Sequence, residues 1–232
     1  MRSVILQPSY LPWLGYFDQM CKSDVFVIYD DVQYDKNSWR NRNRIKTPQG
    51  WQWLTVPVLL KGRNFPLNRD VEINTDLPWQ SKHLKSIIQN YRQAPFFTDF
   101  IGLLEGVLTR EWKFLIEVNI EFLYLLKKQL GLQTEICMAS ELNIPKVGKT
   151  ERLIEICRHL GADSFLEGDA GKNYIDKTLF SNAGIRLEYH HYQHPVYQQL
   201  HGDFIPYLSV VDLLFNHGSE SSQILTNRKT IT

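Results

Sequence analysis

The sequence has no excess of charge of either sign, and this limits the partners that its composition can suggest. Its 26 lysines and arginines face 25 aspartates and glutamates, which gives a formal net charge of +1. Overall charge therefore gives no reason to expect nucleic acid or an anionic membrane surface as a partner. Any binding of an anion must rest on a local cluster of cationic side chains.

Cysteine is scarce, and long apolar runs are missing. The three cysteines stand at scattered positions, Cys21, Cys137 and Cys157. An odd number without a paired motif is typical of reduced thiols, and the apolar helical pattern around Cys157 indicates a small buried side chain. The apolar stretch 114–131 is interrupted by two glutamates and an asparagine, so it predicts no membrane span. No basic and apolar leader opens the chain, and we expect a cytoplasmic protein.

What the sequence does contain is an alternation of short apolar strands and amphipathic helices. We expect strands at 3–7, 24–32, 134–140, 163–168 and 185–192, and helices at 12–23, 78–93, 96–112, 114–131, 149–161, 171–184 and 208–216. Residues 42–59 alternate around Pro48-Gln49-Gly50, which predicts a β-hairpin. The alternation predicts a doubly wound α/β fold with a mainly parallel sheet, in a Rossmann-like or nucleotidyltransferase-like layout.

The same pattern predicts how the chain is divided. We expect a single α/β domain over residues 1–218, with a helical insertion at about 76–131 and a polar, frayed tail at 219–232. Ligands of such sheets bind beyond the carboxyl ends of the strands, where the strand order reverses. The loops at 7–16, 30–46, 140–149, 168–172 and 190–201 are therefore the ones that can carry a site.

The first loop joins a strand to a helix through two prolines, aromatic residues and a glycine. Trp13 and Tyr16 flank Leu14-Gly15 with the spacing at which nucleotidyltransferase-type folds place two histidines beneath a phosphate. Indole N–H and phenol O–H groups can donate hydrogen bonds, but neither carries a positive charge. The alternative is a tight turn whose aromatic rings pack on the sheet. The loop makes Gln7, Tyr10, Trp13 and Tyr16 candidate substrate-binding residues.

The second loop combines paired aspartates with alternating arginines. Asp30 and Asp31 close a strand, and Arg40, Arg42 and Arg44 alternate with asparagines. On a strand, these arginines would share one face and repel each other unless an anion or carboxylates lie between them. Guanidinium groups suit phosphate or carboxylate ligands, while a structural network with the aspartates is the competing interpretation.

Two further loops resemble parts of phosphate-binding motifs. Gly148-Lys149-Thr150 matches the end of a P-loop, but Asn143 stands where the first glycine belongs and Pro145 removes an amide. A weaker anion site at a helix start, with Lys149 beside it, is compatible with the sequence. Gly168 and Lys172 form a similar glycine-rich turn after a strand, and both turns could equally be solvated surface loops.

Four histidines fall close together near the C-terminus: His190, His191, His194 and His201. On a strand, His190 and His191 would face opposite sides, and no cysteine accompanies them, so we predict no metal site. His194, before a proline, is one candidate general base, and Asp31 is the other.

Four long stretches of the chain together resemble the WbqC-like family of bacterial proteins, from Gln7 to about Gly218. They are "QPSYLPWLGYFDQM", "DDVQYDKNSWRNRNRIKTPQGWQWLTVPV", "GKTERLIEICRHLGADSFLEGDAGKNYID" and "YQHPVYQQLHGDFIPYLSVVDLLFNHG". Members of this family are encoded with surface-polysaccharide genes and are described as glycine transferases. The resemblance implies an acyl or aminoacyl (glycyl) transferase that acts on an amino-sugar precursor of bacterial surface polysaccharide, such as lipopolysaccharide O-antigen.

Such a transferase needs an anion site, a base and hydrogen-bond donors for a tetrahedral oxyanion. For the anion, we expect the cationic residues of the loops: Arg40, Arg42, Arg44, Lys149 and Lys172. The expected partner is a small anionic molecule such as a nucleotide-sugar, and no cofactor is predicted beyond a nucleotide or an activated acyl donor. No Ser-His-Asp pattern is visible, which favours direct attack by the acceptor. The alternatives are a nucleotidyltransferase-like or adenylate-forming enzyme and a non-catalytic ligand-binding protein.

Overall fold

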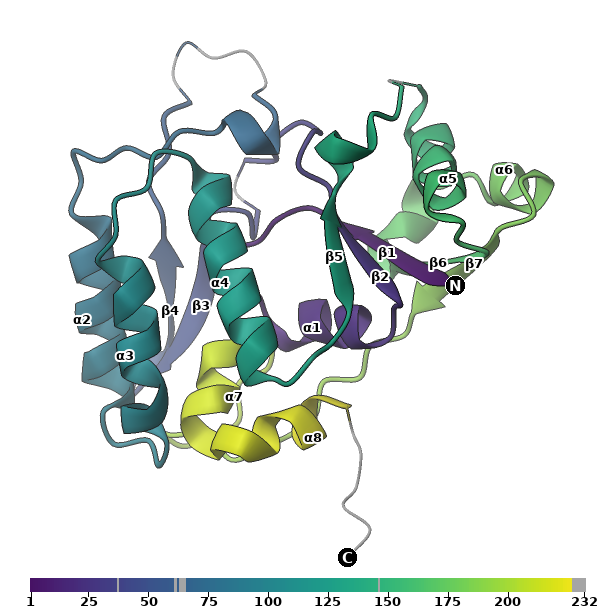
Figure 1. Ribbon diagram of the computed structural model, residues 1–232. Helices are drawn as coiled ribbons and strands as arrows, with labels where there is room; N and C mark the ends of the chain where they lie inside the picture. Colours follow the sequence, from purple (N-terminus) through teal and green to yellow (C-terminus); the bar gives the residue numbers. More distant parts are fainter. Residues whose placement is uncertain (37, 61, 63–65, 146, 227–232) are drawn as a thin grey trace, which may run out of the picture.

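The computed structural model describes residues 1–36, 38–60, 62, 66–145 and 147–226. Five parallel strands form the main sheet, in the order β5-β2-β1-β6-β7. They are β1 (Arg2–Leu6), β2 (Val25–Ile28), β5 (Glu135–Met138), β6 (Ser164–Gly168) and β7 (Arg186–His190). Helices cover both sides of this sheet (Figure 1), so the expected α/β fold with a mainly parallel sheet is confirmed.

The two faces of the sheet are buried against different helices, because successive strand side chains point in opposite directions. Ile5, Val27 and Phe165 pack in one apolar cluster with residues of α5 (Lys149–Leu160) and α6 (Lys177–Asn182). Val4 and Phe26 pack in a second cluster with α1 (Leu14–Cys21), α4 (Leu115–Gln129) and α7 (Val210–His217). The neighbouring residues Val4 and Ile5 thus belong to different cores.

A two-stranded antiparallel hairpin stands beside the main sheet. It consists of β3 (Arg42–Thr47) and β4 (Gly50–Thr55), and Gly50 adopts a positive φ of 118° in the turn. Ile45 and Leu54 face the core that also contains α2 (Trp79–Tyr91) and α3 (Phe97–Leu108). The hairpin and the helices of the 76–131 segment are therefore present as expected.

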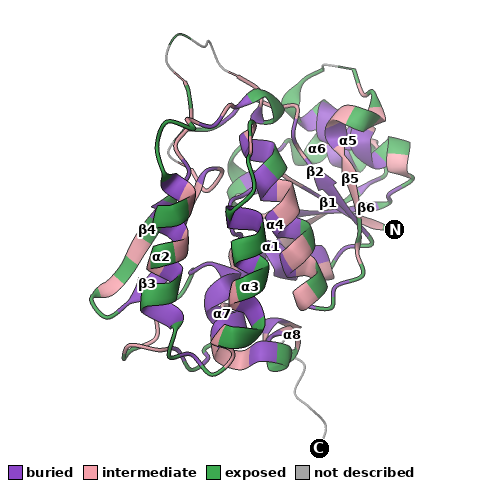
Figure 2. Cartoon of the chain, turned by 60° about the vertical axis from the view of Figure 1, so that its left-hand side comes forward, coloured by how far each residue is buried: buried purple, intermediate pink, exposed green. Residues whose placement is uncertain are grey.

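Inner sides of the helices are buried and outer sides are exposed, as the colours of Figure 2 show. In the part of the chain that the structure describes, no helix is both long and apolar enough to cross a membrane. The helices thus use their apolar stripes to cover the sheet and each other.

Several elements differ from the expected boundaries. The strand expected at 24–32 ends at Ile28, so Asp30 and Asp31 lie in the turn after β2 and do not close the strand. The first helix begins at Leu14 rather than Pro12, because Trp13 has extended backbone angles. The helix expected at 171–184 begins at 177, since 169–173 form a 3-10 turn. Within the expected frayed tail, residues 221–226 instead form α8 (Ser221–Thr226), which buries Ser221 and Leu225. Residues 227–232 of that tail lie outside the described residues.

The strand order places a switch point at β1. The chain passes from β1 to β2 on one side and later adds β6 on the other side. Loops that leave the carboxyl ends of β1 and β6 therefore diverge, and such a point is where α/β sheets bind ligands. Gln7 follows β1 there, and Gly168 is the last residue of β6.

Candidate functional site

Arg40 lies at the carboxyl ends of the strands, and its backbone is held by two other parts of the chain. The Trp39 carbonyl accepts hydrogen bonds from the Ser9 hydroxyl (2.9 Å) and the Tyr10 amide (3.2 Å). The Arg40 carbonyl accepts one from the Asn119 amide of α4 (2.9 Å). These bonds fix where the Arg40 side chain starts, which is the condition for a preorganised binding group.

The Arg40 guanidinium lies among phenols rather than carboxylates. Its positive charge acts on Tyr16, Tyr34 and Tyr174, and Asp35, on the exposed loop, is the carboxylate that acts on it. Burial lowers the pKa of Arg40 below its ordinary value, but an arginine stays protonated in proteins. Its buried Nε has no hydrogen-bond partner among the described residues. Desolvation of a cation costs free energy, and an anionic ligand that reached this Nε would offset that cost.

Glu167 is a second unusual group at this edge. It is the penultimate residue of β6, is only 6% exposed, and accepts a hydrogen bond from the Gly168 amide (2.9 Å). Burial raises the pKa of Glu167 to about 7, although hydrogen bonds from Gly168 and Tyr174 oppose the shift. Gly171 makes room for this carboxylate, because a Cβ there would collide with Glu167. A carboxyl group that titrates near pH 7 is suited to proton transfer.

Tyr174 connects the two groups. Burial raises the pKa of Tyr174, and the negative charge of Glu167 raises it further, while the Arg40 charge lowers it. The phenol therefore lies within range of both charges. A cation, a carboxyl group near neutrality and a hydroxyl donor thus share one edge of the sheet.

Asp31 is held in an ion pair. Its Oδ2 accepts a hydrogen bond from Nη2 of Arg152 on α5, and the two side chains are only 13% and 8% exposed. Asp31 Oδ1 and Arg152 Nε have no hydrogen-bond partner among the described residues. The partner of Asp31 is thus a helix arginine rather than an arginine of its own loop, and Asp31 would have to leave this pair to act as a free base.

Gln7 and Tyr10 point to different environments. The Gln7 side chain accepts a hydrogen bond from Asn68 (3.2 Å), and its carbonyl accepts one from the Tyr16 hydroxyl (3.3 Å). Tyr10 is fully buried, with its hydroxyl 2.8 Å from Nδ1 of His83 on α2. Gln7 and Tyr16 therefore lie with Arg40, Glu167 and Tyr174 at the carboxyl ends of the strands, in what we call the strand-end site. Tyr10 belongs to the core.

The packing of Trp13 explains why the first loop contains a glycine at position 15. Its indole lies on the backbone of Gly15, where a Cβ would collide with the ring. The ring also contacts Tyr192 and Tyr207, with centroid distances of 5.0 and 5.4 Å. The glycine is thus required by close aromatic packing, and Trp13 and Tyr16 do not point to a common phosphate.

Arg42 and Arg44 lie on the hairpin and not at the strand ends. The predicted alternation is present, since Asn43 turns inward and donates to the Leu11 carbonyl (2.6 Å). Arg42 stacks 4.4 Å above the Trp53 ring, and Arg44 donates to the Tyr207 carbonyl (3.1 Å). The side chains of the three arginines therefore diverge: Arg40 acts on the phenols of Tyr16 and Tyr174 at the strand ends, Arg42 acts with it on Tyr34, and Arg44 lies on the hairpin.

The two lysine turns also lie apart from Arg40. Lys172 is paired with Asp169 inside its 3-10 turn and lies over the Tyr189 ring at 5.3 Å. Lys149 is the exposed first residue of α5, which follows Gly148. Neither lysine has a described contact with Arg40, so the five expected cations do not form one cluster.

The four histidines have four different partners. His190 bonds to buried Asp18, His191 lies 3.7 Å from Asp169, and His201 bonds to the Asn90 carbonyl. His194 donates from Nδ1 to the Pro195 carbonyl (2.9 Å), which leaves Nε2 as an acceptor without a partner among the described residues. Burial lowers the pKa of His194, so this imidazole is neutral at pH 7. No group of three or more metal-ligating side chains was found in the described ranges.

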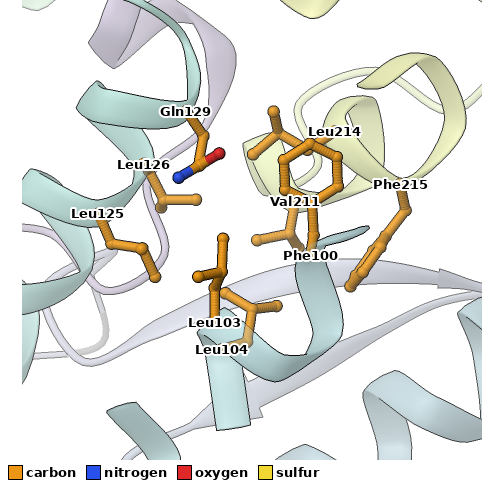
Figure 3. Close-up of a pocket in the computed structure, with 9 residues that line it drawn as sticks. All are labelled: Phe100, Leu103, Leu104, Leu125, Leu126, Gln129, Val211, Leu214 and Phe215. Carbon is orange, nitrogen blue, oxygen red and sulfur yellow. The ribbon is translucent and has the colours of Figure 1, made fainter. Parts of the chain in front are cut away.

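Two hollows of the surface lie away from the strand ends. The cavity drawn in Figure 3 lies between α3, α4 and α7 and is lined by leucine, phenylalanine and valine side chains and by Gln129. It encloses about 10 Å³. Its volume is about that of a single water, so it cannot hold a substrate. A wide hollow of about 460 Å³ lies near Asp24 and Thr134, at the amino ends of β2 and β5. Neither hollow includes a residue of the strand-end site.

Sequence reasoning does not identify several residues of this site, chiefly Glu167, Tyr174, Arg152 and Asn68. One usable signal is that Glu167 is the single charge in the apolar stretch 164–168. Another is that Arg152 lies on the buried side of α5. A charge inside an apolar strand or stripe indicates a buried partner or a functional role.

Comparison with known proteins agrees with the resemblance found in the sequence. The family model of the WbqC-like protein family matches residues 7–224. The chain is also 38% identical over 224 residues to the uncharacterized protein Rv1507c of Mycobacterium tuberculosis (strain ATCC 25618 / H37Rv), a match that covers 95% of this chain and 96% of that protein. No solved structure matches the chain. With a family match over nearly its whole length and a relative of equal extent, the chain belongs to the WbqC-like protein family.

Proposed function

We propose that the chain is a transferase that moves an acyl or aminoacyl group, such as glycyl, onto the amine of an amino sugar used for bacterial surface polysaccharide. The observation that supports this most is that Arg40 and Glu167, from distant parts of the chain, both act on Tyr174 beside the switch point. A buried guanidinium whose Nε has no hydrogen-bond partner among the described residues suits the phosphate or carboxylate of a small anionic donor. A carboxyl group with a pKa of about 7 suits the removal of a proton from an amine.

The reaction follows from these two roles. The acceptor nitrogen attacks the carbonyl carbon of the activated acyl donor, and the bond from that carbon to the leaving oxygen or sulfur breaks. The attacking nitrogen loses one proton to the Glu167 carboxylate, which can pass it to the leaving group. Each phenol has a single O–H donor, which Tyr16 gives to the Gln7 carbonyl and Tyr174 to Glu167, so either hydroxyl would have to leave that bond in order to donate to the tetrahedral oxyanion.

Direct attack by the amine is preferred to a covalent enzyme intermediate. The buried thiol of Cys157 bonds to the Ser3 hydroxyl, and burial raises its pKa to about 11. Such a thiol is not a thiolate at neutral pH and is a poor nucleophile. Cys157 lies on the buried face of α5, in the apolar cluster between this helix and the sheet, as its sequence pattern indicates.

Replacement of Arg40 tests the anion site. Arg40→Ala should weaken the binding of a UDP-linked amino sugar roughly tenfold to a hundredfold in titration calorimetry, because a hydrogen-bonded charge is lost. Arg158→Ala is the matched control, since Arg158 is an exposed arginine paired with Glu155 on α5. Equal affinity of Arg40→Ala and the wild type would remove Arg40 from the site.

Replacement of Glu167 tests the base. Glu167→Gln should retain ligand binding but lower the rate of glycyl transfer from a glycyl thioester at least about a hundredfold. In the wild type, the rate should rise with pH to a plateau above about 7, because only the ionised carboxylate accepts a proton. Mass spectrometry of the amino sugar measures both results. A pH profile that is unchanged in Glu167→Gln would contradict the assignment.

A further inference from the structure

The outward face of the hairpin carries a compact group of aromatic and cationic side chains, two of them exposed and three half-buried, which we call the tryptophan face. It consists of Trp39, Arg42, Arg44, Trp51 and Trp53. Trp51 and Trp53 are 44% and 37% exposed, in contrast to the buried Ile45 and Leu54 on the inward face. Exposed tryptophans gathered in one place are unusual on a monomer surface and indicate a binding role.

The guanidinium groups lie over the indole rings, and the rings meet at an angle: Trp39 and Trp53 are tilted by 56°, and Trp51 and Trp53 meet edge to face at 82°. The Arg44 guanidinium carbon lies 5.4 Å from the Trp39 ring centroid, 5.0 Å from that of Trp51 and 5.8 Å from that of Trp53. The Trp39 and Trp51 centroids lie 5.3 and 5.6 Å from that of Trp53. Cation–π contacts of this kind hold the rings in place before any ligand arrives.

The charge of this face has one sign. On this face, Arg44 of β3 pairs across the strands with Trp53 of β4, and Lys46 pairs with Trp51. The outward residues of β3 and β4 include no carboxylate. Lys46 is buried and donates to the carbonyls of Gly202 and Asp203. Lys46 is therefore satisfied by the backbone, and the arginines supply the charge beside the exposed rings.

We propose that the tryptophan face binds a nucleotide, with the nucleobase stacked on one of the exposed indole rings and the phosphate close to the arginines. A base is a planar ring that can stack on the face of one indole, and guanidinium groups match phosphate oxygens. Trp39 is adjacent to Arg40 in the chain, so a phosphate carried by the same molecule would lead toward the strand ends. In that respect the inference deepens the proposed function, since it assigns the base of the nucleotide-linked ligand to the hairpin.

Calorimetry with UDP, ADP and inorganic pyrophosphate separates the two parts of the ligand. Trp53→Ala and Trp51→Ala should each weaken UDP and ADP binding about tenfold and leave pyrophosphate binding unchanged. Arg40→Ala should weaken all three ligands. If the tryptophan variants lose affinity for UDP and ADP but not for pyrophosphate, the nucleotide site on the tryptophan face is supported, even if Arg40→Ala has no effect.

A matched control exists elsewhere in the chain. Arg110 stacks on Trp112 at 4.4 Å, the same distance as Arg42 on Trp53, in the turn between α3 and α4. Trp112→Ala should leave nucleotide binding unchanged. Trp53→Phe keeps a ring at the site and should retain part of the affinity, which guards against loss of the fold as the explanation.

Two results would overturn the inference. One is equal affinity for UDP and pyrophosphate together with unchanged UDP binding in both tryptophan variants. The other is a change of molecular mass in sedimentation when Trp51 or Trp53 is replaced, which would identify the face as a contact between two copies of the chain.

Discussion

At the residue scale, the molecule separates side chains that are adjacent in the sequence and joins others that are far apart. Arg40 and Arg42 are two positions apart, but one lies among phenols at the strand ends and the other on an indole ring. Glu167 and Arg40 come from distant segments and act on the same phenol. The direction of each side chain is set by its local backbone, so spacing along the chain does not predict which charges meet.

A buried histidine makes the stability of the fold depend on pH. Burial lowers the pKa of His83 to about 4, while an unfolded histidine titrates near 6.5. Between these values the unfolded chain binds more protons, so the free energy of unfolding should fall as the pH drops from about 6.5 to 4. The full loss corresponds to about 3 kcal/mol.

Comparison of the wild type with His83→Gln by urea unfolding measures this dependence. Glu167 acts in the opposite sense, because its raised pKa makes the fold less stable as the pH rises from about 4.5 to 7. The difference between the two proteins at each pH cancels that contribution. A difference that stays constant from pH 6.5 to 4 would show that His83 is not the titrating group.

At the scale of elements, the strands and most helices follow from the apolar pattern, whereas loop conformations do not. The five strands are short apolar segments whose alternate side chains pack into the cores on the two sides of the sheet. Each overlaps the segment that the pattern predicts. The start of α1 depends on Trp13 packing over Gly15, a contact that no periodicity contains. The strand-end site depends on tertiary hydrogen bonds to Trp39 and Arg40, and so could be predicted only as a set of loops.

Gly15 should be irreplaceable at the start of α1. Gly15→Ala places a Cβ against the Trp13 indole and should lower the free energy of unfolding by about 1–3 kcal/mol. Gly106→Ala is the control, because Gly106 lies inside α3 with open space around its Cα, and alanine there should stabilise by about 0.5–1 kcal/mol. Removal of the indole by Trp13→Ala should relieve much of the Gly15→Ala effect, as a double-mutant cycle would show.

At the scale of the whole molecule, the C-terminal segment belongs to the core. Leu225 on α8 is 2% exposed and joins the cluster that contains α1 and α7. A polar composition suggested a frayed end, but the spacing of a few apolar residues is enough to fix one short helix when the rest of the fold offers a surface.

Truncation of this leucine tests that role. Leu225→Ala should lower the free energy of unfolding by about 2 kcal/mol or more, as for other buried leucines. Leu77, which is 48% exposed, provides the control, and Leu77→Ala should change the value by less than about 0.5 kcal/mol. Equal effects of the two substitutions would show that α8 does not contribute to the core.

The hydrogen bond from Asn119 to the Arg40 carbonyl has a consequence for how ligand preference can change. A small shift of the long helix that carries Asn119 would move the arginine with it. Substitutions on that helix, far from any bound molecule, could thus retune selectivity while the chemistry at the end of β6 stays the same.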